Sequence, residues 1–343
     1  MVASNLDSQG SIREGLSPMR AMLCHGFEGI GSLRFGETAE PVPAPDEVLV
    51  DVHAASVSYM DYLMVSGGYQ LRPPLPYVPG TDAAGIVAAV GEKVTRFGPG
   101  DRVACANWYG GFAERMTAKA SRTVRLPDNL DFAAGSTVLH VYLTAWYALV
   151  ERAQLRPGEI VLVTGAAGGV GLGCVELAHA MGARVIAAVG SPEKADIVRR
   201  YGADHVINYA SEDIRERIKS FTEGEGVDVC VENVGGRLFA TIARLMRWNG
   251  RLMPIGFAGG EIPSVPMNLP LLKNYSIVGV FSGAWCEKFP EEQARAAETV
   301  MTWISQDRLR PHVDRILPVE QAADAMRAIA ERSAQGRIVL KVR

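Results

Sequence analysis

The sequence predicts an α/β protein in which a small, mostly β domain precedes a doubly wound parallel sheet. Residues 20–126 consist of strand-like runs between proline and glycine turns, whereas residues 160–281 alternate strand-like and helix-like segments. The length of 343 residues agrees with two domains, because it is too long for one ordinary hydrophobic core.

The composition is that of a globular protein, with 48% hydrophobic and 21% charged residues. A formal net charge of −3 provides no basic surface for nucleic acid or an anionic membrane, so we expect neither partner. The cysteines lie far apart without a CxxC pair, which argues against disulfides and a cysteine-rich zinc lobe and for a reducing, cytoplasmic location. They are Cys24, Cys105, Cys174, Cys230 and Cys286.

Two segments resemble targeting or membrane signals. Residues 1–18 are small and polar without an apolar core, so we expect a mobile leader and no secretory signal. Residues 132–150 carry no Asp, Glu, Lys or Arg, and their length is marginal for a membrane span. They include polar residues such as Ser136 and Thr144, which favours a buried helix at a domain junction.

The first region contains an alternating strand and one short helix. Valines at 48, 50 and 52 lie on one face of a strand that follows a proline-stiffened loop. The helix runs from Tyr59 to about Val65, with Ser58 before it and Asp61 three positions later, which is the arrangement of a capping box. Turns at 79–80, 91 and 99–101 separate further strands, and another strand signal lies at 112–117.

The second region repeats a strand–helix rhythm. The expected strands are 160–164, 184–189, 204–207, 227–232, 250–256 and 276–281, and the expected helices are 169–181, 192–201, 211–221 and 236–246. This alternation implies a parallel sheet with right-handed crossovers and a ligand crevice at the carboxyl ends of its strands.

The C-terminal part does not extend this rhythm. It reads as a helix at 290–305, a strand near 313–316, a helix at 319–332 and a strand from Arg337 to Val342. Because this mixed order breaks the parallel pattern, we expect it to fold back onto the first domain.

The segment 158–173, GEIVLVTGAAGGVGLG, carries the main functional signal. An apolar strand runs through glycines directly into a helix, which is how a dinucleotide-binding βαβ unit begins, although alone it also suits a tight turn. The helix N-terminus offers unpaired N–H groups and a positive dipole end to a pyrophosphate. In the GxGxxG frame, alanine replaces the first glycine. The predicted cofactor-binding residues of this turn are Ala166, Ala167, Gly168, Gly169, Val170 and Gly171.

The end of the second strand of this unit favours NADPH over NADH. An NAD site places a carboxylate there for the ribose 2′-hydroxyl, and that charge would repel a 2′-phosphate. Gly190 and Ser191 leave room for the phosphate instead. Lys194 can neutralise it, and Tyr209 follows the third strand at the same rim. Glu193 opposes this interpretation but suits the first turn of a helix, where it can point to solvent.

Several stretches, in order along the chain, resemble one family. They are VSYMDYLMVSGGY, PPLPYVPGTDAAGIVAAVG, GGFAERMTAKA, LTAWYAL, TGAAGGVG, GSPEKADIVRRYGADHVINY and QGRIVLKV. Through them residues 20–343 resemble the zinc-independent quinone oxidoreductase branch of the medium-chain dehydrogenase/reductase superfamily. The resemblance implies a GroES-like catalytic domain at 19–138 and 284–343, a Rossmann domain at 139–283, and a homodimer that pairs through strand 276–281.

The resemblance also implies that no metal is bound. Zinc-dependent relatives place a Cys at the position of Ser58, a His-Glu pair at Thr81-Asp82, and a Cys or Asp at His140. Only Asp82 and His140 keep ligand-capable side chains, which is fewer than the three protein ligands of a catalytic zinc.

The resemblance assigns catalytic roles to four residues. Tyr69 stands where related enoyl reductases carry a tyrosine proton donor, although it also suits packing at a cleft rim. His140 stands where a ligand would project toward the substrate, although a lone histidine on an apolar helix also suits the core. Ser58 replaces an asparagine common in quinone reductases and Asp61 keeps the family's acid, although both also suit helix capping.

Further cofactor contacts follow from the same resemblance. Thr144 matches the threonine near the nicotinamide, Asn233 follows the fourth strand of the nucleotide domain, and Gly256 follows the fifth. Phe281 lies where backbone groups meet the carboxamide. Arg337 stands where many relatives have lysine.

These expectations predict an NADPH-dependent, zinc-free reductase that transfers hydride to a small-molecule quinone or α,β-unsaturated carbonyl. Leu63 and Val65 replace polar or aromatic residues of close quinone-reductase relatives, which makes the expected pocket more apolar and leaves the acceptor open. One alternative is an enoyl-thioester (acyl-CoA or acyl carrier protein) reductase, which needs a cationic track for the thioester's tail. The other is a non-enzymatic NADPH-binding sensor or scaffold.

Overall fold

The computed structural model of the protein describes residues 17–343, which form two compact units. The first unit extends to His140 and resumes at Phe289–Arg343, and the second comprises Val141–Lys288. The breaks thus fall at 140/141 and 288/289, beside the 138/139 and 283/284 of the sequence-based division, whose assignment as functional domains stays a proposal. The predicted leader, residues 1–18, lies outside the described residues except for its last two positions.

The first unit is built on one large sheet, whose strands, over residues 17–343, follow the order β14-β15-β3-β4-β5-β7 with β6 also paired to β3. A separate antiparallel ladder joins β1 and β2. The bounds are β1 (Pro18–Cys24), β2 (Leu33–Ala39), β3 (Glu47–Val57), β4 (Asp82–Val90), β5 (Arg102–Ala106), β6 (Arg115–Lys119), β7 (Thr123–Arg125), β14 (Val313–Pro318) and β15 (Arg337–Lys341).

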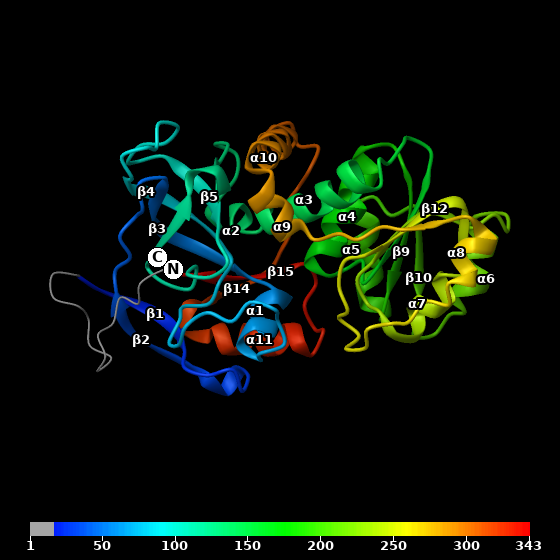
Figure 1. Ribbon diagram of the computed structural model, residues 1–343, viewed down its shortest axis with the longest axis horizontal. Helices are drawn as coiled ribbons and strands as arrows, with labels where there is room; N and C mark the ends of the chain where they lie inside the picture. The colour runs from blue at the N-terminus through cyan, green and yellow to red at the C-terminus, as the bar shows by residue number, and fades with distance from the viewer. Residues whose placement is uncertain (1–16) are drawn as a thin grey trace. The chain divides into compact units, whose positions relative to one another are not determined.

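Strand β3 organises this unit. Its valines 48, 50 and 52 are buried in one core cluster, as the alternation predicts. Strand β15 pairs antiparallel with β3, so the C-terminal part returns to the first unit as expected. The helices are α1 (Tyr59–Val65), α2 (Phe132–Gly135), α10 (Pro290–Ser305) and α11 (Ala322–Ala330), with α1 and α11 side by side (Figure 1).

The second unit holds a parallel sheet with the strand order β10-β9-β8-β11-β12-β13 among the described residues. Every neighbouring pair is parallel, and the direction of winding reverses between β8 and β11. The strands are β8 (Ile160–Thr164), β9 (Arg184–Val189), β10 (His205–Asn208), β11 (Val227–Glu232), β12 (Met246–Pro254) and β13 (Ser276–Ile277). The helices are α3 (Val138–Trp146), which crosses the boundary of the units, α4 (Gly169–Ala180), α5 (Ala195–Arg200), α6 (Ile214–Phe221), α7 (Gly236–Ile242), α8 (Asn268–Lys273) and α9 (Ser282–Lys288).

Several expected boundaries need correction, among them the start of α6 at Ile214 instead of 211. Strand β12 begins at Met246, before the predicted 250, and consequently α7 ends at Ile242 instead of 246. Strand β13 ends at Ile277 instead of 281, because it pairs on one side only, with β12, and the chain enters α9 at Ser282. The uncharged stretch 132–150 forms α2, α3 and a π-helical turn (Tyr147–Arg152). No helix of residues 17–343 is both long and apolar enough to cross a membrane.

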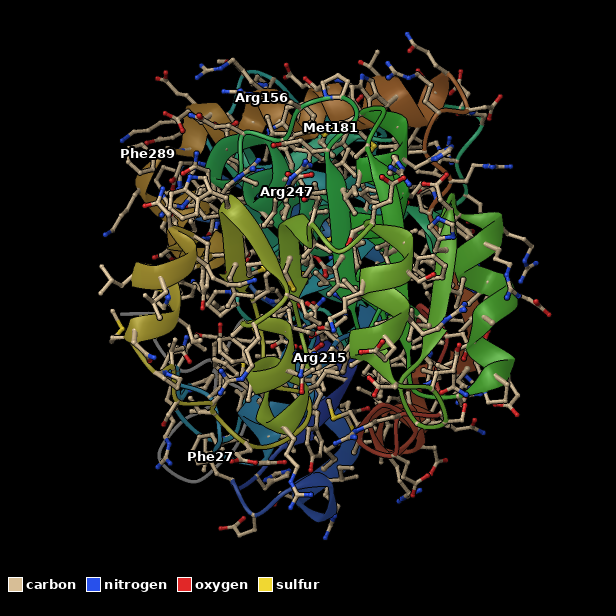
Figure 2. All side chains as sticks on the ribbon, turned by 90° about the vertical axis from the view of Figure 1, so that its right-hand side faces the viewer. Phe27, Arg156, Met181, Arg215, Arg247 and Phe289 are labelled. Atoms are coloured by element: carbon tan, nitrogen blue, oxygen red, sulfur yellow. The ribbon has the colours of Figure 1, made fainter. Side chains whose placement is uncertain are left out.

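The parallel sheet places all carboxyl ends of its strands at one edge. In Figure 2, Arg156, Met181 and Arg247 lie toward the end of this sheet where β8, β9 and β12 begin, and Arg215 lies toward the opposite end. Arg215 belongs to the first turn of α6, directly after β10 and its loop. The residues that follow β8, β9, β10, β11 and β12 therefore gather at that opposite edge, where an α/β sheet binds its ligand.

Candidate functional site

The glycine turn after β8 explains the alanine in its motif. The left-handed conformation falls on Gly165, with φ at 57°, one residue before Ala166. Ala166 is fully buried, and its N–H donates to the carbonyl of Ala188 at 3.2 Å. A methyl group is therefore compatible with position 166, because the glycine-only backbone lies at position 165.

The start of α4 is packed closely against this turn. A Cβ on Gly171 would lie 2.3 Å from the carbonyl oxygen of Gly165, so only glycine permits this approach. The N-cap is Gly168, and no side chain within the described part of the chain caps the helix. The first-turn N–H groups thus lack a side-chain acceptor, and the structure brings the predicted residues 166–171 together around them.

The residues after β9 and β10 form the second part of the predicted cofactor site. Tyr209 donates its backbone N–H to the carbonyl of Val189 at 3.0 Å, which ties the two strand ends together. A Cβ on Gly190 would lie 2.9 Å from the Tyr209 hydroxyl. The structure therefore brings Gly190 and Tyr209 together, and a side chain at position 190 would displace the phenol.

Ser191 and Lys194 lie beside an acidic residue at the same rim. A hydrogen bond from the Ser191 hydroxyl is the main cause that lowers the pKa of Glu193, and Lys194 contributes an attraction. Ser191 is the N-cap residue of the turn Pro192–Lys194 that leads into α5. The residue that opposed the NADPH prediction is thus engaged with the residues that support it.

Asn233 and Gly256 lie at the carboxyl ends of β11 and β12. The Asn233 amide donates to the carbonyl of Thr164 at 2.9 Å, across the point where the strand order reverses. Gly256 donates to the carbonyl of Glu232 at 3.4 Å. The sequence reasoning missed Thr164 and Glu232, although a carboxylate that ends a buried run, Val227–Glu232, is a signal that could have identified them.

Thr144 and Phe281 both belong to the second unit, where a side-chain contact joins Thr144 to the residue that follows Phe281. The Thr144 hydroxyl lies 3.0 Å from the hydroxyl of Ser282, the residue after Phe281. The Phe281 side chain itself is 49% exposed. The structure therefore brings Thr144 to the start of α9, and the nicotinamide contacts of both residues stay predictions.

In the first unit, Ser58 and Asp61 form the predicted capping box at the start of α1. Asp61 Oδ2 accepts from the Ser58 N–H at 2.7 Å and from its hydroxyl at 2.6 Å, while the Asp61 N–H donates to Ser58 Oγ at 3.0 Å. Both residues are buried, and burial is the largest influence on the Asp61 pKa, which it raises. Capping accounts for this pair, and its catalytic roles stay predictions.

A cluster of titratable side chains lies beside the capping box, with Asp82 and Arg337 buried and His140 partly buried. His140 Nδ1 is 3.9 Å from Asp82 Oδ2. Burial raises the pKa of Asp82 to about 7 against the attraction of Arg337, and burial lowers the pKa of His140 to about 3. The imidazole is therefore neutral at pH 7. Asp82 is a further residue that the predicted catalytic set omitted, although the Thr81-Asp82 pair after a glycine turn marks it.

Arg337 lies inside the first unit and is buried. Its Nη1 donates to the carbonyl of Val57 at 3.0 Å, and Asp82 and Asp61 attract its charge. Its contact with the cofactor stays a prediction. No group of three or more His, Cys, Asp or Glu side chains within residues 17–343 is arranged to hold a metal ion.

Tyr69 lies in an aromatic group of the first unit. Its ring centroid is 6.4 Å from that of Trp108, with the planes tilted by 46°. Burial raises the pKa of the Tyr69 phenol, so it stays protonated at neutral pH. The loop that carries Trp108 is fixed by backbone bonds from Asn107 to Thr81 and from Gly111 to Gly80, next to Asp82. The sequence reasoning did not single out Trp108.

Comparison with known proteins agrees with both units. Residues 44–128 match the alcohol dehydrogenase GroES-like domain family, and residues 169–300 match the zinc-binding dehydrogenase family. These matches confirm the predicted fold class, a GroES-like domain with a Rossmann-like parallel sheet.

Individual relatives match over nearly the whole chain. The chain is 35% identical to quinone oxidoreductase-like protein 2 of Mus musculus over 325 residues, which are 94% of this chain and 92% of that protein. It is 35% identical to the quinone oxidoreductase of Sus scrofa over 306 residues, 89% and 92% of the two chains. A solved mycobacterial protein complexed with NADPH shares 30% identity at a TM-score of 0.88 over 94% of this chain and 100% of its own. The chain is therefore an oxidoreductase that belongs to the quinone oxidoreductase branch of the medium-chain dehydrogenase/reductase superfamily.

Proposed function

We propose that the protein is an NADPH-dependent, zinc-free reductase that transfers hydride to a quinone or an α,β-unsaturated carbonyl. The observation that carries the proposal is the pairing of an uncapped α4 N-terminus with a rim at Gly190, Lys194 and Tyr209 that lacks the NAD-type carboxylate. The names of the mouse and pig relatives, and the mycobacterial relative complexed with NADPH, support it.

The residues of the second unit fit NADPH. A pyrophosphate site requires α4 to pack closely against the glycine turn, and a Cβ at Gly171 would prevent this packing. Ser191 and Lys194 would hold the 2′-phosphate beside the Tyr209 hydroxyl, and the Ser191 hydroxyl would then exchange its bond to Glu193 for one to the phosphate. Thr144, Asn233, Gly256 and Phe281 would hold the nicotinamide half, the part that supplies the hydride when the cofactor is bound.

The first unit supplies neutral hydrogen-bond donors for the acceptor's oxygen, and of these the Tyr69 phenol is the one that can also give up a proton. Tyr69 carries its proton at neutral pH because burial raises its pKa. His140 is neutral because burial lowers its pKa, so it acts as a neutral N–H donor and not as an imidazolium acid. Ser58 and Asp61 would fix α1 beside these groups. Arg337 would balance the carboxylates of Asp61 and Asp82.

The side chains present do not fit a catalytic zinc. The Ser58 hydroxyl is committed to Asp61, which leaves Asp82 and His140 as donors. A catalytic zinc requires three protein ligands. The Arg337 guanidinium also lies in this cluster and already attracts Asp82. The charge that develops on the acceptor's oxygen would therefore be stabilised by the Tyr69 hydroxyl, which also donates the proton, and by the neutral imidazole of His140.

The second unit has an edge suited to a second copy of the chain. Strand β13 pairs with β12 alone among the described strands, so its outer edge carries unpaired backbone groups. Apolar side chains are exposed on and before it, namely Met267, Leu271, Leu272 and Ile277. These features support the homodimer. The free cysteines, most of them buried thiols, support a cytoplasmic location.

The test is the oxidation of NADPH in the presence of 1,4-benzoquinone, a simple enone or an enoyl-CoA, followed by absorbance, with NADH in parallel. Turnover with the quinone or the enone, faster with NADPH than with NADH, is the expected result. Turnover confined to the enoyl-CoA would assign the protein to the enoyl-thioester reductases. Tight NADPH binding without turnover of any acceptor would make it a non-enzymatic binding protein.

A further inference from the structure

The carboxyl ends of β8 and β11 are joined by a buried side-chain bond. These two strands flank the point where the strand order reverses. Thr164, the last residue of β8, donates its hydroxyl to Oε1 of Glu232, the last residue of β11, at 2.8 Å. Both residues are fully buried, with 0% exposure. The bond therefore bridges the position at which open α/β sheets receive a ligand.

These two side chains also bind the loop that follows β11. The Thr164 hydroxyl accepts the N–H of Asn233 at 2.9 Å. Glu232 accepts the N–H of Val234 at 3.1 Å with Oε1 and the N–H of Gly235 at 2.8 Å with Oε2. Each of the three consecutive N–H groups of residues 233–235 thus donates to one of the two side chains, which fixes the backbone of this loop.

The next loop depends on the first. Ala258 donates to the carbonyl of Asn233 at 3.0 Å, and Gly259 donates to the carbonyl of Val234 at 2.7 Å. A Cβ on Gly259 would lie 2.5 Å from that same oxygen, so the two backbones are in close contact. Any shift of residues 233–235 is therefore passed to residues 258–259, whereas the predicted cofactor residue Gly256 is bonded directly to the carbonyl of Glu232 at 3.4 Å.

A fully buried glutamate is a costly way to hold a loop. Burial raises the pKa of Glu232, whereas the hydrogen bonds from Thr164, Gly235 and Val234 lower it. Paired apolar side chains would fill the same space without this desolvation penalty. Apolar side chains could not accept hydrogen bonds from the N–H groups of residues 233–235 and so could not fix their direction. The arrangement thus gives the crevice a defined backbone shape at the expense of stability.

We propose that Thr164 and Glu232 are positioning residues that hold the floor of the cofactor crevice in its binding shape. They act through Asn233–Gly235 and, beyond it, residues 258–259. This inference rests on the proposed binding of NADPH to the second unit.

The second unit offers a matched control for Thr164. Thr222 is likewise a buried threonine whose hydroxyl donates once, to the carbonyl of Ile218 at 2.8 Å, and accepts once, from the N–H of Gly226 at 3.0 Å. It precedes β11 and therefore lies at the opposite end of that strand from Glu232. Replacing either threonine by valine removes one donated and one accepted hydrogen bond. Only the replacement of Thr164 does so at the carboxyl ends of the strands, where the cofactor is proposed to bind.

The experiment compares T164V, T164S, T222V and T222S in the full-length protein. The dissociation constant of NADPH is measured by the change in nucleotide fluorescence, and stability by thermal unfolding. We expect both valine variants to unfold at lower temperature. We expect T164V alone to weaken NADPH binding, by about tenfold or more, and T164S, which keeps the hydroxyl, to restore it. In turnover, T164V should raise the KM for NADPH more than that for the acceptor.

Wild-type NADPH affinity in a folded T164V, or equal losses in T164V and T222V, would overturn the inference. If T164V does not fold, Glu232→Gln decides in its place. Glutamine keeps the size of the side chain but has one acceptor oxygen in place of two. Its NH2 group would face an N–H or O–H donor that binds a carboxylate oxygen in the wild type. Wild-type affinity in that variant would overturn the inference equally. Failure of the wild-type protein to bind NADPH is a separate result, which would remove the proposed function itself.

Discussion

The Tyr209 hydroxyl lies over Gly190, and a Cβ at position 190 would come within 2.9 Å of it. This contact connects the ends of β9 and β10 at the place where an NAD-dependent enzyme carries its carboxylate. An acidic side chain at position 190 would therefore collide with the Tyr209 hydroxyl. If this rim holds the cofactor as proposed, we expect its preference for NADPH to depend on Gly190 and Tyr209 together and not on either residue alone.

Gly190→Asp should lower NADPH affinity by about tenfold or more, through displacement of Tyr209 and repulsion of the 2′-phosphate. It should not create NADH binding while the phenol occupies the space. The double variant Gly190→Asp with Tyr209→Ala should bind NADH better than the single variant. Binding of both nucleotides is measured by titration, with Gly190→Ala to separate the steric part from the charge. A single variant that already prefers NADH would contradict this account.

Lys194→Ala should weaken NADPH binding by roughly 1.5–3 kcal/mol while sparing NADH, because only NADPH carries the phosphate that the ammonium would neutralise. Dissociation constants for both nucleotides provide the measurement. Lys219→Ala, which removes an exposed lysine paired with Glu216 on α6, is the control and should change neither constant. Equal losses for the two nucleotides in Lys194→Ala would rule out the 2′-phosphate assignment.

Tyr69→Phe should lower kcat for enones far more than it changes NADPH affinity, because the phenol would donate a proton to the acceptor and not to the cofactor. For quinones the loss should be smaller, since their reduced oxygens can take protons from water. Tyr109→Phe is the matched control, because this partly buried tyrosine packs edge-on against Tyr77 and lies against the same hydrophobic core cluster as Tyr69. Unchanged enone turnover in Tyr69→Phe would remove Tyr69 from the chemistry.

The neighbouring side chains of Asp82, which is buried, and His140, which is partly buried, should give stability two opposing dependences on pH. The pKa of Asp82 is raised from 3.8 to about 7, so its contribution is present at low pH and is lost as pH rises through 7. The pKa of His140 is lowered from 6.5 to about 3, so its contribution is present above pH 6.5 and is lost as pH falls toward 3.

Asp82→Asn should therefore leave only the histidine's dependence. Between pH 4.5 and pH 6.5, the free energy of unfolding of this variant should fall more steeply on acidification than that of the wild type. Above pH 7 the variant should gain stability relative to the wild type, because the amide imitates the protonated acid. Urea unfolding at pH values from 4.5 to 8 measures both trends. Parallel profiles for the two proteins would contradict the shifted pKa of Asp82.

The sequence was most informative where burial alone decides structure. Strands β8, β9 and β11 begin and end at the predicted residues, because each is a short apolar run covered on both faces. The start of β12 was missed because Arg247, Trp248 and Asn249 are polar or exposed and Asn249 has φ at 61°, none of which resembles a buried strand.

The sequence predicted those features of the candidate site that depend on a single residue type. It did not predict contacts between residues that are distant along the chain. Gly165 and Gly171 are recognisable because a turn and a close approach each demand glycine. The partnership of Thr164 with Glu232 joins residues 68 positions apart. These residues are neighbours because β8 and β11 are adjacent in the sheet, and the local sequence pattern does not predict which strands are adjacent. The same is true of Trp108 beside Tyr69, since a loop between two strands brings them together.

The position of β15 in the first sheet has a consequence for biosynthesis. This strand lies between β14 and β3, yet the ribosome makes it only after every residue of the second unit. During translation residues 54–57 of β3 must therefore wait without the partner strand β15, although β6 already pairs with residues 47–51. By then the parallel sheet of Val141–Lys288 has all its strands. The nascent chain should complete its second unit first and its first unit last. A ribosome that stalls before Arg337 would release a protein in which part of a sheet edge is open.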